Sequence, residues 1–109
     1  MDLNEYLNKG REKRYSCFGG VVILACNPLV RCKDGYSVSV QCQEHSYCYP
    51  RQNLPDVSAY TSFELGFPSE IDDTISKFAE EEDTLDTVFP YVPRSVVEEL
   101  IRKHGGIEV

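Results

Sequence analysis

The sequence has no tryptophan, one methionine and no apolar run near the roughly 20 residues that a membrane-spanning helix needs. It begins Met-Asp-Leu-Asn-Glu-Tyr, which is too polar for the apolar core of a secretion signal. We therefore expect a cytoplasmic protein with no membrane partner. Five cysteines are an odd number, and in the cytoplasm they are expected to be reduced thiols rather than disulfides.

Sequence motifs of the common enzyme classes are also missing. The sequence has no Gly-x-Ser-x-Gly, no Walker A motif and no glycine fingerprint for dinucleotides. Gly19 and Gly20 precede an expected strand rather than a helix, so they lack the helix N-terminus that usually cradles phosphate. We expect neither an enzyme nor a cofactor.

Basic residues are few and unevenly placed. The formal net charge is −7, with seven Lys or Arg against five Asp or Glu in residues 1–51 and four against thirteen in residues 52–109. Phosphate backbones repel an acidic protein, so direct DNA binding is not expected. The basic run Lys9, Arg11, Lys13 and Arg14 is a local exception, which we interpret first as a solvated helix end and linker.

Length and periodicity predict the fold. A chain of 109 residues, 41% hydrophobic and 27% charged, is expected to form one domain, residues 1–109. Helices are predicted over residues 2–8, 69–80 and 93–104. Strands are predicted over residues 21–26, 29–32, 36–42 and 60–67, with a short extended piece over 87–92. This predicts an α+β fold, an antiparallel sheet of three to five strands with two or three helices packed on one face.

Three local patterns give this prediction its detail. Residues 21–26 are apolar on both faces, which is typical of a central strand. Residues 36–42 alternate after an Asp-Gly turn, placing Ser37, Ser39 and Gln41 on a polar face that is either exposed or lines a pocket. The helix over residues 69–80 is expected to be capped by Ser69 and to bury one apolar stripe, made of Ile71, Ile75, Phe78 and Ala79.

Residues 45–51 gather hydrogen-bonding and stacking side chains more densely than any other segment, and we call them the crest. They include His45, Tyr47, Tyr49 and Arg51. Tyrosine offers stacking area with a polar tip, and arginine offers a planar fork for phosphate or carboxylate. The crest therefore predicts either an interface hot spot or a nucleotide pocket. The alternative is that its tyrosines pack on the core and Arg51 pairs with a nearby acid.

A metal site and a thiol nucleophile are the competing interpretations of this region. Cys42, His45 and Cys48 are spaced Cys-x2-His-x2-Cys, and Cys26 or Cys32 would complete a four-ligand zinc set. Cys48 and His45 also form a local thiol–histidine pair. The spacing belongs to no common zinc module, however, and no orienting residue is recognisable. We expect no metal, and we expect Cys26 and Cys42 to be core residues.

Five acidic residues cluster late in the chain, and they have two interpretations. The cluster could imitate phosphates and occupy a basic nucleic-acid channel on a partner, or it could be a solvated helix end. Its members are Glu80, Glu81, Glu82, Asp83 and Asp86.

Several segments together resemble a group of small accessory proteins encoded by tailed phages and prophages. They are residues 19–28, Asp-Gly-Tyr-Ser-Val-Ser-Val-Gln at 34–41, His-Ser-Tyr-Cys-Tyr-Pro-Arg at 45–51, Glu-Leu-Gly-Phe-Pro-Ser at 64–69 and residues 90–106. The resemblance covers nearly the whole chain but implies no catalytic residue. This chain departs from the usual pattern at residues 42–44, where small residues are common.

The resemblance implies a phage protein in the cytoplasm of a host cell, and two functions follow. The first is stoichiometric binding to a host protein or nucleoprotein complex, for example inhibition of a CRISPR complex, through the crest and the acidic cluster. The second is sequestration of a nucleotide signal in a pocket between subunits of a homo-oligomer, lined by Ser37, Ser39, Gln41, Tyr47 and Arg51. Excess acid favours the first, because a nucleotide site needs positive potential.

Overall fold

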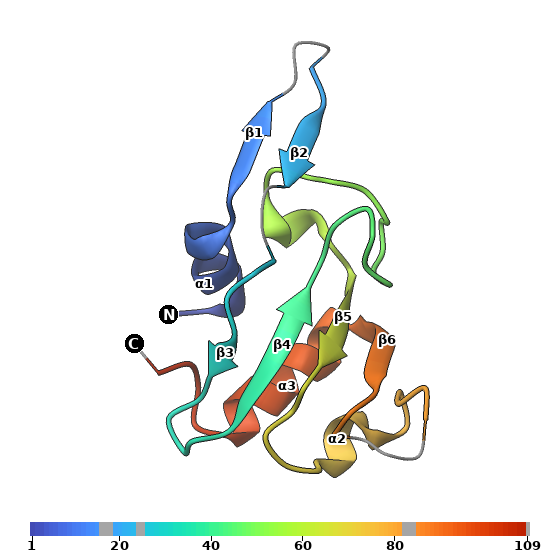
Figure 1. Cartoon of the computed structure of the whole chain (residues 1–109). Helices are drawn as coiled ribbons and strands as arrows, with labels where there is room; N and C mark the ends of the chain where they lie inside the picture. Colours follow the sequence, from blue (N-terminus) through green and yellow to red (C-terminus); the bar gives the residue numbers. More distant parts are fainter. Residues whose placement is uncertain (16–18, 24–25, 82–84, 109) are drawn as a thin grey trace.

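Four antiparallel strands form the main sheet in the order β3–β4–β5–β6 (Figure 1). The computed structural model describes residues 1–15, 19–23, 26–81 and 85–108. The strands are β3 (Val30–Arg31), β4 (Ser37–Gln41), β5 (Ser62–Gly66) and β6 (Val88–Pro93). The helices are α1 (Leu3–Gly10), α2 (Asp73–Ser76) and α3 (Arg94–Lys103), with a 3-10 turn η1 (Val57–Ala59). This confirms the predicted α+β class and its antiparallel sheet.

Helix α3 covers one face of the sheet, and the core lies between them (Figure 1). Alternation along each strand sends every second side chain toward the helix. The buried side chains of this core are Val38, Val40, Phe63, Leu65, Phe89, Val92, Val97, Leu100 and Ile101. The other sheet face carries Ser37, Ser39 and Gln41, each half-buried, so the predicted polar face of β4 is confirmed.

The β3–β4 hairpin forms where it was predicted. Val30 pairs with Val38, and Gly35 has the positive φ of +97° that the turn needs. The predicted central strand over residues 21–26, in contrast, is wrong. Strand β2 (Val21–Ile23) pairs with β1 (Lys13–Tyr15) in a separate hairpin that extends away from the sheet (Figure 1), and its residues are only half-buried. Leu24 and Ala25 of this prediction lie outside the described residues.

Helix α1 begins as predicted, with the Asp2 carboxylate accepting the Glu5 N–H at 2.8 Å. Its buried residues Leu3 and Leu7 face the core, and the helix lies against η1. Gly10 lies at its end because a Cβ there would be 2.5 Å from Pro28 Cγ. The last residue of α1 therefore has to lack a side chain, because the segment that contains Pro28 packs directly against it.

The helix predicted over residues 69–80 is much shorter in the structure. Asp72, not Ser69, caps α2, and its carboxylate accepts the Thr74 N–H at 2.8 Å. The Ser69 hydroxyl instead accepts the Ser37 N–H at 2.9 Å, which holds residue 69 against β4. Ile71 is consequently 65% exposed, whereas Ile75 is buried as predicted.

Candidate functional site

The crest is an exposed ridge whose side chains alternate between the interior and solvent. Ser46 and Cys48 are buried, whereas Tyr47 and Tyr49 are 38% and 65% exposed and Arg51 is also exposed. The structure therefore brings the three predicted contact residues to the surface. The alternative, in which the tyrosines pack on the core and Arg51 pairs with a nearby acid, does not hold for the exposed Tyr49, and Arg51 forms no ion pair with a described residue.

Backbone hydrogen bonds hold the crest against the sheet at two places. The Tyr49 N–H donates to Ser62 O at 3.3 Å, and Tyr49 O accepts the Thr61 N–H at 2.8 Å. Tyr47 O accepts the Tyr91 N–H of β6 at 2.9 Å. Since these bonds fix the backbone, binding would not have to order the main chain of the crest.

Arg51 lies over the ring of Tyr47, with its guanidinium carbon 4.8 Å from the ring centroid. Its Nε donates to Glu44 O at 3.2 Å. Among the described residues no acceptor lies within hydrogen-bond distance of its two Nη atoms, so the outer edge of the fork is open. His45 contacts the neighbouring Glu44 carboxylate at 3.2 Å and is also exposed, so it extends the polar side of the crest.

Tyr91 is a member of this surface that the sequence analysis missed. Its ring centroid is 6.1 Å from that of Tyr47, and the residue is 48% exposed. It lies at an irregularity in β6 and has a positive φ of 54°, which is unusual for a bulky side chain. A bulge re-aims a side chain that would otherwise follow the alternation of the strand, and a pattern-based prediction cannot see it.

The thiols of Cys42 and Cys48 are both buried. Burial raises the pKa of the Cys48 thiol to about 11, and its Sγ contacts the carbonyls of Gln43 and Pro50. Burial also raises the pKa of Cys42, which confirms Cys42 as a core residue. Cys26, expected in the core, is exposed. Among the described residues no group of three His, Cys, Asp or Glu side chains is placed to hold a metal ion.

Ser39 and Gln41 lie on the uncovered sheet face rather than with Arg51. Gln41 and Asn27 exchange two hydrogen bonds: the Asn27 N–H donates to Oε1 at 2.8 Å, and Nε2 donates to Asn27 O at 3.1 Å. Both residues line a hollow that also contains Glu64. Ser37 is not among the lining residues of that hollow. The structure therefore does not gather the five residues of the expected nucleotide pocket in one place.

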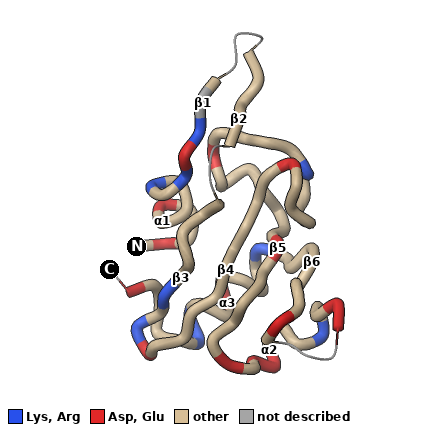
Figure 2. The backbone as a smooth tube through the Cα atoms, in the orientation of Figure 1, with Lys and Arg blue, Asp and Glu red and all other residues tan. Residues whose placement is uncertain are grey.

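Acidic residues concentrate around α2 and the loop after it, at the end of the molecule away from the β1–β2 hairpin (Figure 2). Glu80, Glu81 and Asp86 of the acidic cluster are exposed. Glu82 and Asp83 lie outside the described residues. Arg11 of the basic run is buried, so this run is not the uniformly solvated segment that the sequence indicated.

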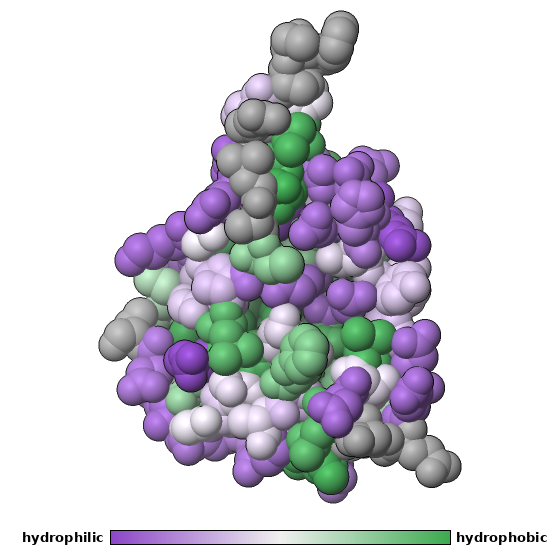
Figure 3. Space-filling view, in the orientation of Figure 1, coloured by the Kyte–Doolittle hydropathy of each residue, from purple (hydrophilic) through white to green (hydrophobic). Residues whose placement is uncertain are grey.

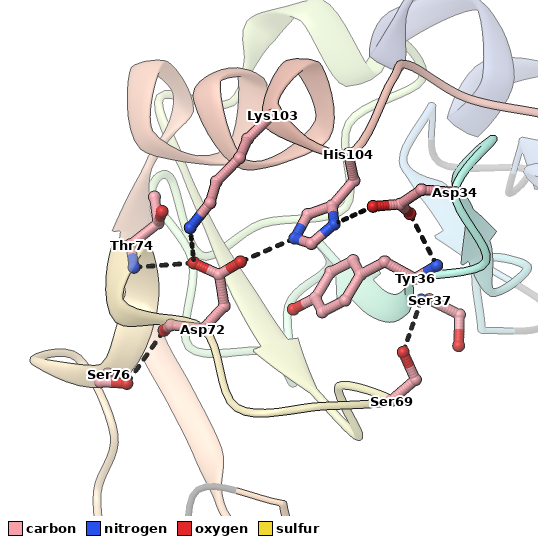
Figure 4. A network of polar contacts seen from close by, with 9 residues as sticks. All are labelled: Asp34, Tyr36, Ser37, Ser69, Asp72, Thr74, Ser76, Lys103 and His104. Atoms are coloured by element: carbon pink, nitrogen blue, oxygen red, sulfur yellow. Dashed lines mark hydrogen bonds and ion pairs between the residues drawn. The ribbon is translucent and has the colours of Figure 1, made fainter.

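A network of charged groups around the buried side chains of His104 and Asp72 was not anticipated (Figure 4). His104 Nδ1 is 2.6 Å from Asp34 Oδ2, and its Nε2 is 2.6 Å from Asp72 Oδ2. Lys103 Nζ adds a contact of 3.0 Å to Asp72. The Tyr36 ring stacks on the imidazole of His104, with the ring centroids 3.9 Å apart and an angle of 8° between the ring planes. The network ties the β3–β4 turn, the start of α2 and the end of α3 together.

Both nitrogens of His104 have to donate, because each faces a carboxylate that accepts. Burial alone would lower the pKa of His104, but the bonds to Asp34 and Asp72 outweigh it and raise that pKa. Burial acts on Asp72 in the opposite sense, yet the Thr74 N–H and His104 hold the pKa of its carboxyl well below the ordinary range. The two carboxylates therefore favour the imidazolium form of His104 and engage both of its ring nitrogens.

Comparisons with known proteins give no identity. No family model matches the chain, and neither a curated protein nor a solved structure is similar to it. No helix formed by the described residues is long and apolar enough to cross a membrane.

Proposed function

We propose that this protein acts by stoichiometric binding, with the crest as its contact surface, and that it inhibits a host protein or nucleoprotein complex as a phage or prophage accessory protein. The observation that carries the proposal is the arrangement of Tyr47, Tyr49, Tyr91 and Arg51. These aromatic and arginine side chains are exposed on a backbone that hydrogen bonds already fix. Tyrosine and arginine are the residues that dominate binding energy at protein interfaces.

Charge supports a partner with a basic surface. The net charge of −7 and the exposed acids around α2 disfavour a nucleic-acid partner and favour a protein that itself carries positive charge. A nucleic-acid-binding site on a host defence complex is such a surface. The phage setting rests on the sequence resemblance, and the CRISPR complex is one example of the class.

A tyrosine exchange tests the proposal. Tyr49→Ala is expected to reduce recovery of the host partner from lysate at least about tenfold, because truncating a central interface tyrosine commonly costs more than 1.4 kcal/mol. The measurement is a pull-down with the purified chain as bait, followed by titration of the recovered protein. Tyr49 is 65% exposed, and its side chain forms no hydrogen bond, ion pair or ring contact with the other described residues, so the melting temperature is expected to stay nearly unchanged.

Tyr15→Ala is the matched control, since Tyr15 is also 65% exposed but lies on the β1–β2 hairpin. It should retain wild-type recovery. Equal loss in both variants, or recovery of no host protein above background with the wild type, would contradict binding through the crest.

Nucleotide sequestration is the second proposal, and one observation favours it. The open fork of Arg51 above the Tyr47 ring could hold a phosphate beside a stacking surface. Calorimetry against cyclic and linear nucleotides is expected to show saturable binding that Arg51→Ala abolishes. Lys33→Ala, which removes an exposed positive charge from the β3–β4 turn, is the control, and heat of binding that survives Arg51→Ala would count against this site.

A further inference from the structure

The uncovered face of the main sheet carries a hollow of about 460 Å³ between the segment that leads into β3 and the end of β5. Figure 3 shows this face, with hydrophobic residues grouped near its middle and hydrophilic residues around them. The residues that matter for its chemistry are Leu29, Ser39, Gln41, Glu64, Phe67 and Val88. Three of them are apolar, two are neutral and polar, and one is charged.

The neutral polar residues of the hollow are already engaged with the protein. Both ends of the Gln41 amide bond the backbone of Asn27, and its Nε2 also donates to Ser39 Oγ at 2.9 Å. These contacts make the hollow preformed. They also leave Gln41 with little capacity to recognise a ligand, so recognition has to come from other residues of the hollow.

Glu64 is the one charged residue among the described residues that line the hollow. One of its oxygens accepts the Tyr47 N–H at 3.3 Å. It forms no ion pair with any described residue, and the nearby Arg51 stacks on Tyr47 instead. A half-buried carboxylate beside apolar side chains favours a cation, because the surroundings screen its charge less than water does.

Phe67 points to a ligand for a reason that is independent of charge. Its φ is +49°, a conformation that costs a bulky residue energy, and its side chain is 71% exposed. An aromatic side chain here therefore aids neither the backbone nor the packing of the core. Strain of this kind persists at positions that serve binding, and Phe67 borders the hollow.

We infer that the hollow receives a lysine or arginine side chain of a protein partner. Its methylene stem would pack against Leu29, Phe67 and Val88, and its charged head would reach Glu64. A basic partner also suits the net charge of −7. The inference rests on the proposed binding function only for the source of this side chain. The hollow itself is a site separate from the exposed rings of the crest.

A pair of short peptides tests the site directly. The chain is titrated with N-acetyl-Gly-Lys-Gly-amide and with the norleucine peptide, which has the same stem without the charge, while backbone amide shifts are recorded by NMR. The lysine peptide is expected to give saturable shifts at Ser39, Gln41 and Gly66. The affinity of the lysine peptide is expected to be about tenfold higher than that of the norleucine peptide, which corresponds to a difference of about 1.4 kcal/mol in binding free energy.

Variants separate recognition by the hollow from general attraction to an acidic protein. Glu64→Gln should abolish the preference for lysine, whereas Glu80→Gln, an exposed acid outside the hollow, should keep it. Phe67→Gly should weaken the binding of both peptides. Its melting temperature should be unchanged or up to about 4 °C higher, because glycine adopts the positive φ without strain.

The inference would be overturned by shifts spread over all exposed acids without saturation, by undiminished lysine preference in Glu64→Gln, or by equal affinity for the two peptides. Shifts at the hollow that depend on protein concentration without peptide would show that a second copy of the chain occupies it, which also overturns the inference. None of these outcomes bears on the Tyr49→Ala pull-down, so failure here is distinguishable from failure of the proposed function.

Discussion

Asp72→Ala is expected to lower the free energy of unfolding by about 3 kcal/mol, the cost of removing one partner from a buried ion pair. The Asp72 side chain is only 3% exposed. Its carboxylate accepts from the Thr74 N–H, from Lys103 Nζ and from His104 Nε2. The alanine variant loses the cap of α2 and leaves the buried imidazolium with a single carboxylate.

Urea denaturation measures this effect, with Asp73→Ala as the matched control. Asp73 is the next residue in the chain but is exposed, so its removal is expected to change stability by no more than about 0.5 kcal/mol. Asp72→Asn should fall between the two variants, since asparagine can still cap the helix but carries no charge. Equal stability of the two alanine variants would show that the network contributes nothing.

The network also sets the direction of the pH dependence. Because the pKa of His104 is raised in the folded state, the stability that its charge contributes is fully present below the ordinary histidine pKa of about 6.5. This stability is lost as pH rises through the folded-state pKa. The lowered pKa values of Asp34 and Asp72 mean that their contribution is complete above about pH 4 and is lost as pH falls. Stability should therefore be greatest between about pH 4 and 6.5, and Asp72→Ala should flatten both limbs of the profile.

The parts of the fold that local patterns determine were predictable from the sequence. The alternation in 36–42 gave β4 with its buried face, and the apolar spacing over Val97, Leu100 and Ile101 gave α3. Period and turn chemistry are properties of neighbouring residues, so no tertiary information was needed.

The errors arose where contacts outside a segment override its own pattern. Residues 21–26 are apolar enough for a central strand, but among the described residues β2 pairs with β1 alone, the strand just before it in the chain, so its apolar side chains stay half-buried. The helix expected from Ser69 begins four residues later because His104 and Lys103 hold the Asp72 carboxylate at the start of α2.

The candidate site also contains residues that the sequence indicated and one that it did not. The alternation of Tyr47, Tyr49 and Arg51 indicated that they share one side, but it left open whether that side packs on the core, and only the structure shows all three exposed. Tyr91 joined them only because a bulge in β6 and a contact over 44 positions of sequence place its ring beside Tyr47. Neither determinant has a local signature in the sequence.

Arg11→Ala is expected to lower the free energy of unfolding by about 4 kcal/mol, since it removes three hydrogen bonds that a charged donor makes in the interior of the protein. Arg11 is only 6% exposed. Its Nε donates to Leu54 O at 3.1 Å, one Nη donates to Cys42 O at 2.9 Å, and the other donates to the Tyr60 hydroxyl at 3.0 Å. These three acceptors flank the crest in the chain, with Cys42 before it and Leu54 and Tyr60 after it.

Arg11→Lys is the more informative variant, because lysine keeps the charge but cannot direct donors to three acceptors at once. Its free energy of unfolding is expected to fall by about 2 kcal/mol. At temperatures where the variant is folded, it is expected to bind the partner of the crest more weakly, because Arg11 no longer holds the chain on both sides of the crest. Lys9→Ala, an exposed exchange in the last turn of α1, should alter neither property. Wild-type partner affinity in a measurably destabilised Arg11→Lys would show that the crest keeps its shape without this arginine, and that its preorganisation comes from the bonds to β5 and β6 alone.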